Sequence, residues 1–138
     1  MTTDDLNRFR LDEQQRNALE FKLRLTEEAG GMMSADEVQA LLKLPTKEAL
    51  LNAESAREVF AVEENGELHF PILQFDEGKV RPGLIEVLKA APRTSGWRLL
   101  QYLLHSEDGL AGDKPIDLIR GSPEDIDRAV RFARRLEH

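Results

Sequence analysis

The segment between residues 95 and 120 restricts the fold of this 138-residue chain more than any other. Residues 95–104 read SGWRLLQYLL, and residues 109–120 read GLAGDKPIDLIR. The apolar side chains of the first stretch cover two adjoining helix faces, which predicts a helix that is buried on most sides. Gly112 suits a tight turn, and Pro115 takes the favoured first position of a second helix, which we expect to run to about Arg120.

A third helix is predicted to follow Ser122, which can cap it, with Pro123 at the first position and two acidic residues in the first turn. Its apolar face comprises Ile126, Ala129, Val130, Ala133 and Leu136. Four arginines lie around the rest of it, namely Arg128, Arg131, Arg134 and Arg135. Arginine is favoured at protein interfaces because its planar head makes forked hydrogen bonds and stacks well. A helix with one apolar face and one arginine-rich face can therefore enter a partner's cleft, although such a face is often simply solvated.

The N-terminal part is predicted to be one helix over residues 4–29, ended by Gly30 and Gly31. Its apolar residues include helical spacings, but they form a broad and irregular stripe. The pattern leaves open whether this helix packs on its own domain or on a second subunit.

Residues 34–70 have the outline of a small winged helix. Ser34 and Glu37 have the spacing of a capping box, and Thr46 can cap a second short helix that runs to about Glu54. Two β-prone runs, residues 59–62 and 67–70, flank Asn65-Gly66, which is a strong hairpin signal. We therefore expect a mainly α protein with an N-terminal helix (1–30), a winged helix-turn-helix-like unit with one β-hairpin (31–92) and a C-terminal helical domain (93–138).

The charge and residue composition of the chain disfavour several classes of function. The net charge is −7, and residues 1–92 hold 11 basic and 18 acidic side chains, whereas residues 93–138 hold 8 of each. This balance disfavours strong non-specific nucleic-acid binding and favours a protein partner for the C-terminal part. The chain has no cysteine, no apolar run long enough for a membrane span and no secretory pattern at its start, so we expect a cytoplasmic protein.

Catalytic motifs are not evident in the sequence. Its three histidines lack metal-ligand spacing, and no nucleophile elbow, P-loop or dinucleotide fingerprint occurs. We therefore expect no enzyme activity, no metal and no cofactor.

DNA binding would use the second short helix of the winged unit. Lys47 is its only basic residue, and Arg57, Lys79 and Arg81 could form a small basic area nearby. Glu48 and Glu54 on the same helix, and the acidic predicted wing, would repel a phosphate backbone. Retention of this unit as a packing scaffold is the alternative.

The order of Trp97, an apolar helix, Leu110, Gly112, Pro115 and a further apolar helix resembles the toxin-binding domain of the Xre/MbcA/ParS antitoxin family, whose members are partners of RES-domain toxins. The resemblance covers roughly residue 31 to the C-terminus. It implies an antitoxin that binds a toxin with a fold akin to ADP-ribosyltransferases, and that covers the toxin's NAD-using active site largely through the C-terminal domain. The chain departs from the family in its N-terminal unit, because many members carry an Xre-type helix-turn-helix.

These considerations give two sets of candidate residues. Trp97, Gly112 and Pro115 are expected to hold the C-terminal domain in shape. The expected toxin contacts are Asp117, Arg120, Arg128, Arg131, Arg134, Arg135 and His138. The alternative functions are a DNA-binding transcriptional regulator with a winged helix-turn-helix, and a helical adaptor that forms a homo-oligomer through its N-terminal helix.

Overall fold

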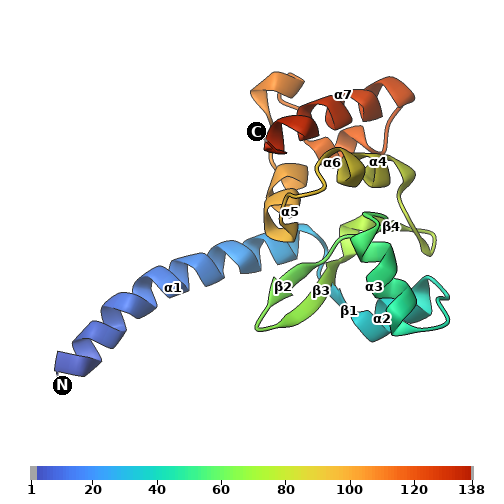
Figure 1. Cartoon of the computed structure of the whole chain (residues 1–138). Coiled ribbons are helices and arrows are strands. Elements are labelled where there is room, and N and C mark those ends of the chain that lie inside the picture. The colour runs from blue at the N-terminus through green and yellow to red at the C-terminus, as the bar shows by residue number, and fades with distance from the viewer. Residues whose placement is uncertain (1–2, 138) are drawn as a thin grey trace.

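Seven α-helices and two small antiparallel sheets make up the described part of the chain in this computed structural model, which describes the backbone of residues 3–137 and the side chains of residues 13–137 (Figure 1). The α-helices are α1 (Thr3–Glu28), α2 (Ala35–Leu41), α3 (Lys47–Ser55), α4 (Pro82–Ala90), α5 (Gly96–Leu104), α6 (Pro115–Leu118) and α7 (Pro123–Ala133). The strands are β1 (Met32–Ser34), β2 (Val62–Glu64), β3 (Glu67–Pro71), β4 (Phe75–Asp76) and β5 (Lys79–Val80). Three short 3₁₀ helices are η1 (Ile72–Gln74), η2 (Asp108–Leu110) and η3 (Arg134–Glu137). The expectation of a mainly helical protein is confirmed.

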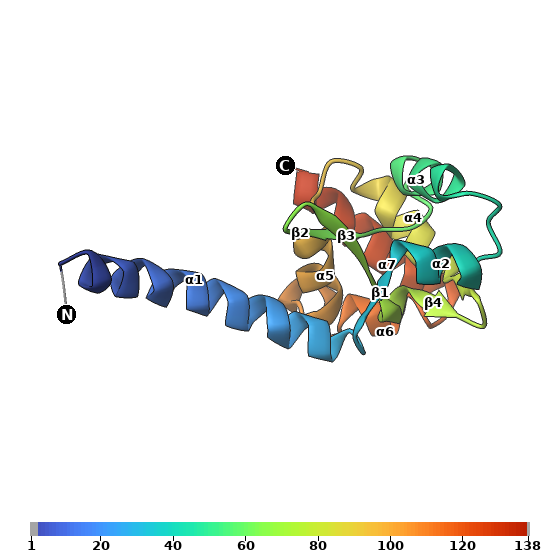
Figure 2. The ribbon, with the colours of Figure 1, turned by 90° about the horizontal axis from the view of Figure 1, so that it is seen from below.

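Helix α1 leaves the rest of the molecule as a long arm (Figures 1 and 2). Its predicted extent is confirmed to within a residue at each end. Gly30 and Gly31, with φ of +81° and +105°, end it as expected, because glycine adopts this left-handed conformation at no steric cost. The chain then enters β1, a strand that the sequence did not indicate.

The segment between β1 and β3 follows the predicted local signals closely. Ser34 and Glu37 form the capping box of α2, and Thr46 caps α3 by accepting from the Ala49 N–H at 3.0 Å. Asn65 and Gly66 both have positive φ, so they form the expected hairpin turn between β2 and β3. The three strands are antiparallel in the order β1-β3-β2.

The first predicted strand starts at Val62 rather than at residue 59. Phe60 lies outside the strand because its backbone N–H and carbonyl form hydrogen bonds with a side chain instead of with a neighbouring strand. The Gln74 amide accepts from the Phe60 N–H at 2.9 Å and donates to the Phe60 carbonyl at 2.8 Å. A buried glutamine therefore replaces the strand ladder at this point.

The buried side chains form two clusters. The smaller one lies between α2, α3 and the sheet and contains Val38, Leu50, Val59, Ala61 and Phe70. The larger one joins α4, α5, α6 and α7 to the C-terminal end of α1, where Leu25 and Ala29 are buried. Helix α4 packs against α7, so close packing crosses the expected domain boundary after residue 92. The division into three parts stays a prediction.

The C-terminal helices begin where the sequence predicted. Helix α5 is buried through most of its apolar residues, and Pro115 is the first residue of α6. Helix α6 ends at Leu118, two residues earlier than expected. Gly112 has φ of +81°, which is the backbone conformation expected for a tight turn.

Within residues 3–137, no helix is both long enough and apolar enough to cross a membrane.

Candidate functional site

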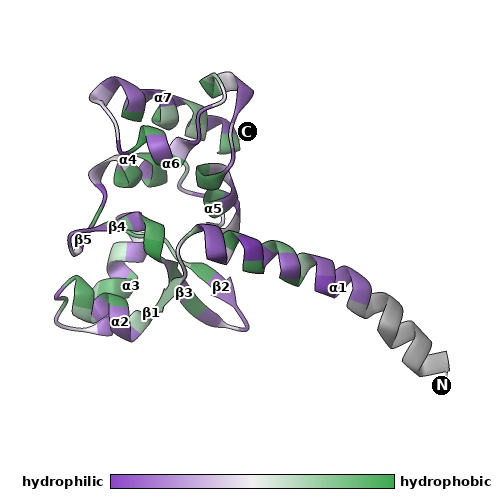
Figure 3. Ribbon diagram, turned by 180° about the vertical axis from the view of Figure 1, so that it is seen from behind, coloured by the Kyte–Doolittle hydropathy of each residue, from purple (hydrophilic) through white to green (hydrophobic). Residues whose placement is uncertain are grey.

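Helix α7 presents its arginines to solvent because its other face is fixed in the larger core. Ser122 caps the helix with a capping box to Asp125, and Pro123 occupies the first position. Ala129 and Ala133 are fully buried, and the Tyr102 hydroxyl donates to the Ala129 carbonyl at 2.7 Å. The rotation of α7 is therefore fixed, and its hydrophilic face turns outward (Figure 3).

Three of the predicted toxin contacts lie in one groove of about 290 Å³. We call it the arginine groove, and it is lined by Gly109, Leu110, Arg128, Arg131, Phe132 and Arg135. Helix α7 and the start of η3 form one wall, and η2 forms the other. The spacing of three and then four residues along a helix places the three guanidinium groups on one side.

Arg128 fastens the two walls together. Its guanidinium donates to the Leu110 carbonyl at 3.0 Å and lies 3.5 Å from Asp113 and 3.4 Å from Asp125. These bonds hold η2 against α7, and the two carboxylates balance the charge. Arg128 is therefore a structural component of the groove as well as a candidate contact.

Arg131 and Arg135 are more available to a partner. Arg131 forms a surface ion pair with Asp127 at 2.8 Å, and 65% of its side chain is exposed. The guanidinium of Arg135 lies 5.1 Å from the centre of the Phe132 ring. In the part of the chain that the structure describes, no carboxylate lies within ion-pair distance of Arg135. The groove thus carries a cation held on an aromatic face, where it can form bidentate bonds with a carboxylate or phosphate.

The other predicted toxin contacts lie elsewhere. Arg134 points to a different face, where it lines a shallow depression with Glu86 and Lys89 of α4. Asp117 and Arg120 line a third depression, beside the end of α1, and no ion pair joins them. His138 is outside the described residues.

The sequence reasoning missed Phe132, which forms the floor of the groove. Its ring lies parallel to that of Tyr102, with centroids 6.0 Å apart, and Gly109 leaves room for its edge. An aromatic residue between two arginines on the polar face of the helix was the available signal. The loop residues Leu110 and Asp113 could not be placed here without knowing how η2 packs.

The end of α7 is held by a carboxylate. Glu137 in η3 accepts from the Thr94 hydroxyl at 2.5 Å and from the Arg93 N–H at 2.9 Å. The hydrogen bond from Thr94 is the main reason that the pKa of Glu137 lies below its ordinary value of 4.5. This contact attaches the last turn, including Arg135, to the segment between α4 and α5.

Protonation of Glu137 should release this attachment. Because its pKa is lower in the folded chain, the contact stabilises the fold above about pH 4.5, and the stabilisation is lost as pH falls through the depressed pKa. We expect Glu137→Gln to melt at a lower temperature than the wild type at neutral pH. The difference between the two melting temperatures should become smaller as the pH falls. Melting curves from pH 3 to pH 7 measure this. Glu86→Gln, an exposed carboxylate on α4, is the control, and a gap that is constant with pH would contradict the assignment.

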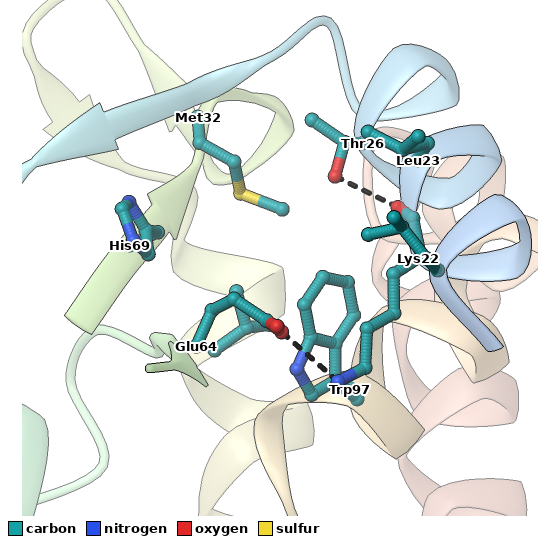
Figure 4. A pocket seen from close by; sticks show the side chains of 9 residues that line it. Lys22, Leu23, Thr26, Met32, Glu64, His69 and Trp97 are labelled. Carbon is teal, nitrogen blue, oxygen red and sulfur yellow. Dashed lines mark hydrogen bonds and ion pairs between the residues drawn. The ribbon is translucent and has the colours of Figure 1, made fainter. Parts of the chain in front are cut away.

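Trp97 borders a second feature, an apolar recess of about 180 Å³ at the base of α1 (Figure 4). Leu19, Leu23 and Thr26 of α1 line it on one side, and Met32 and Trp97 line the other. The indole N–H of Trp97 donates to the Glu63 carbonyl at 3.1 Å, so the ring is fixed to the sheet while one face borders the recess. Lys22 lies 5.3 Å from the ring centre and 2.9 Å from Glu64. Trp97 was expected in the core, and the structure places it, half-buried, at the core's edge.

Three of the four basic residues considered for DNA binding use their charged groups in hydrogen bonds or ion pairs within the protein. Arg57 donates to the carbonyls of Ala91 at 2.7 Å and of Thr94 at 3.3 Å, beyond the end of α4, and its burial lowers the pKa of the guanidinium. Lys47 pairs with Asp36 at 2.8 Å. Arg81 donates to the Leu73 carbonyl at 3.0 Å. Lys79 is exposed.

Among the described side chains of residues 13–137, no cluster of three His, Asp or Glu residues could hold a metal ion. No family model, curated protein or solved structure matches the chain.

Proposed function

We propose that the protein is a non-enzymatic antitoxin that binds a RES-domain toxin and covers its active site with the arginine groove. The observation that carries the proposal is that Arg128, Arg131 and Arg135 line one groove together with Phe132, on α7 and the start of η3, and that α7 is fixed by its buried face. Such a surface combines the features of interface anchors, which are aromatic and arginine side chains in a shaped hollow.

The chemistry of the groove suits acidic groups on the partner. A guanidinium group recognises a carboxylate through two parallel hydrogen bonds, and the guanidinium of Arg135 already lies over the Phe132 ring. We expect carboxylates at the rim of the toxin's cleft to enter the groove, so that α7 and η3 cover the route by which NAD reaches the site.

The sequence resemblance also supports this proposal. Its motif residues belong to the same packing unit as α7, since Leu110 and Pro115 are both buried. Leu110 also provides the carbonyl that Arg128 binds. The family pattern and the groove thus involve one continuous part of the fold.

The test is a comparison of two arginine substitutions on the same helix end. In Arg131→Glu/Arg135→Glu both exposed cations of the groove are reversed, whereas Arg134→Glu makes the same change on another face. With a RES-domain toxin encoded beside this protein, the wild type should bind and stop NAD consumption. The double variant should bind at least roughly 100-fold more weakly, because two interface anchors are lost and reversed in charge.

Arg134→Glu should protect as well as the wild type does. Equal loss in both variants, or full protection by the double variant, would contradict the proposal. Point variants are better than removal of the chain from Ser122 onward, because α7 contributes Ala129 and Ala133 to the core and its loss would unfold the domain.

A DNA-binding regulator is the second candidate, and the order of the elements favours it. The succession β1, α2, α3, β2, β3 with sheet order β1-β3-β2 supports the interpretation of this unit as winged-helix-like. Its charges oppose this function, since Lys47 is paired with Asp36 and the hairpin carries Glu63, Glu64 and Glu67. Operator binding that weakens steeply with salt, and that Lys47→Glu/Lys79→Glu removes, would support it. Arg57 is unsuitable for this test because it holds the end of α4.

A further inference from the structure

Most of α1 forms an arm that projects from the part of the chain that the structure describes. Only its C-terminal end packs on the body, through Leu25 and Ala29, while every side chain from residue 13 to residue 21 is exposed (Figures 1 and 2). Residues 3–24, at a rise of 1.5 Å per residue, project by roughly 33 Å. Leu19 and Leu23 are 51% and 54% exposed. The sequence left open whether this helix packs on its own domain, and among the described residues only its C-terminal end does so.

Helices in proteins owe most of their stability to packing of an apolar face, so an uncovered arm of this length favours a covering partner. Leu19 and Leu23 are one turn apart on one face, and this face continues into the apolar recess beside Met32 and Trp97 (Figure 4). Leu19, Leu23 and the recess therefore form one continuous apolar surface at the base of the arm, against which a second helix can lie.

The sequence of the arm specifies what kind of helix fits. Positions 5, 9, 12, 16, 19 and 23 follow one another at alternating spacings of four and three, which is the spacing of a coiled-coil seam. They are occupied by Asp5, Phe9, Asp12, Arg16, Leu19 and Leu23. The seam thus has two opposite charges at its centre, with Asp5 and Phe9 on one side and two leucines on the other.

This pattern is complementary to itself in one orientation. In two antiparallel copies centred on Gln14, position 12 lies opposite position 16 of the other copy, and position 9 lies opposite Leu19 of the other copy. Positions 12 and 16 then form two opposite-charge layers, between two layers of positions 9 and 19, and the outermost layers pair position 5 with position 23. Two parallel copies in register would instead place Asp12 against Asp12 and Arg16 against Arg16. In coiled coils a polar residue at a seam position specifies the register, and ion pairs between the helices set their orientation.

We propose that the protein forms a homodimer through an antiparallel pair of α1 helices, in which the start of each arm lies beside the other copy's recess at Trp97. The bodies then sit at opposite ends of the pair, and a two-fold axis passes near Gln14. The same patch contacts itself, as in other symmetric dimers.

Mass measurement by light scattering at several concentrations is the first experiment. The wild type should approach twice the chain mass of 15.7 kDa at high concentration and fall toward it on dilution. Leu19→Glu should remain at one chain mass, with an unchanged melting temperature of the body. Leu51→Glu is the matched control, because Leu51 is 47% exposed on α3, away from the arm, and this variant should still dimerise.

A single-chain mass for the wild type at all concentrations would overturn the proposal. If Leu19→Glu instead abolished capture of a toxin by a monomeric wild type, the toxin would be the occupant of the arm and the homodimer would be wrong. Because these masses are measured without a toxin, their outcome is independent of the proposed antitoxin function.

Mixing two charge variants tests the orientation. Asp12→Arg gives a seam with two basic central positions, and Arg16→Asp gives one with two acidic ones, so each alone should stay monomeric. An equimolar mixture should recover the dimer, because each central layer then pairs opposite charges between the chains. Mixing cannot restore a pair within one helix, so recovery reports contact between chains. Two single variants that dimerise as the wild type does, or a mixture that stays monomeric, would overturn this arrangement.

Discussion

Gly96→Ala is expected to lower the free energy of unfolding by roughly 3 kcal/mol or more, although helix propensity alone predicts the opposite sign. Gly96 is the first residue of α5, where alanine would ordinarily be the better helix former. In the folded chain, however, an added Cβ would overlap the carbonyl oxygen of Ala61 and lie 3.1 Å from the Cα of Val62. Both are backbone atoms of a buried segment, so no side-chain rotation can relieve the overlap. Helix α5 would have to move away from the sheet.

Urea unfolding followed by the fluorescence of Trp97, the only tryptophan, measures this loss. Gly112→Ala is the matched control. Gly112 has φ of +81°, and nothing lies near the added Cβ, so this variant should lose only about 1–2 kcal/mol for the left-handed conformation. A Gly96→Ala protein that was as stable as the Gly112→Ala protein would show that α5 and the sheet can separate at little cost.

The two glycines illustrate how far local signals reach. Gly112 could be assigned from the sequence because its role is local, a turn before Pro115. Gly96 could not, because its neighbour in space, Ala61, is distant in the chain. The same difference holds for whole elements: the capping box at Ser34 and the helix cap at Ser122 were predicted correctly, whereas β1 was missed because its strand partner is β3, which is distant in the sequence.

The candidate site was predictable to a similar degree. The spacing of Arg128, Arg131 and Arg135 follows from helix geometry, so their common face could be expected from the sequence. The other wall of the groove could not, because η2 is placed by the bond from Arg128 to the Leu110 carbonyl. For Arg57 the sequence position was misleading. As a basic residue near a predicted recognition helix it suggested DNA binding, but its guanidinium donates to carbonyls beyond the end of α4.

Gln74→Met is the second substitution for which we expect a large effect, a loss of roughly 3–5 kcal/mol. Gln74 has no exposed surface, and its amide bonds the Phe60 N–H, the Phe60 carbonyl and, at 3.1 Å, the Pro71 carbonyl. Methionine has a similar volume and fills the same space, so packing is largely preserved. The buried backbone groups lose their partners, and each unpaired group costs about 1–3 kcal/mol. Gln101→Met, an exposed change on α5, should stay within about 0.5 kcal/mol of the wild type.

Gln74→Glu separates the hydrogen bonds from the shape of the side chain. The carboxylate can still accept from the Phe60 N–H, but it has no hydrogen to donate to the carbonyls, and its charge is buried. We therefore expect the variant to be at least as unstable as Gln74→Met at neutral pH. Its stability relative to Gln74→Met should improve as pH falls, because the protonated carboxyl regains one donor and loses its charge. Unfolding curves of both variants at pH 5 and pH 7 test this, and a relative stability that did not change with pH would mean that the side chain reaches solvent.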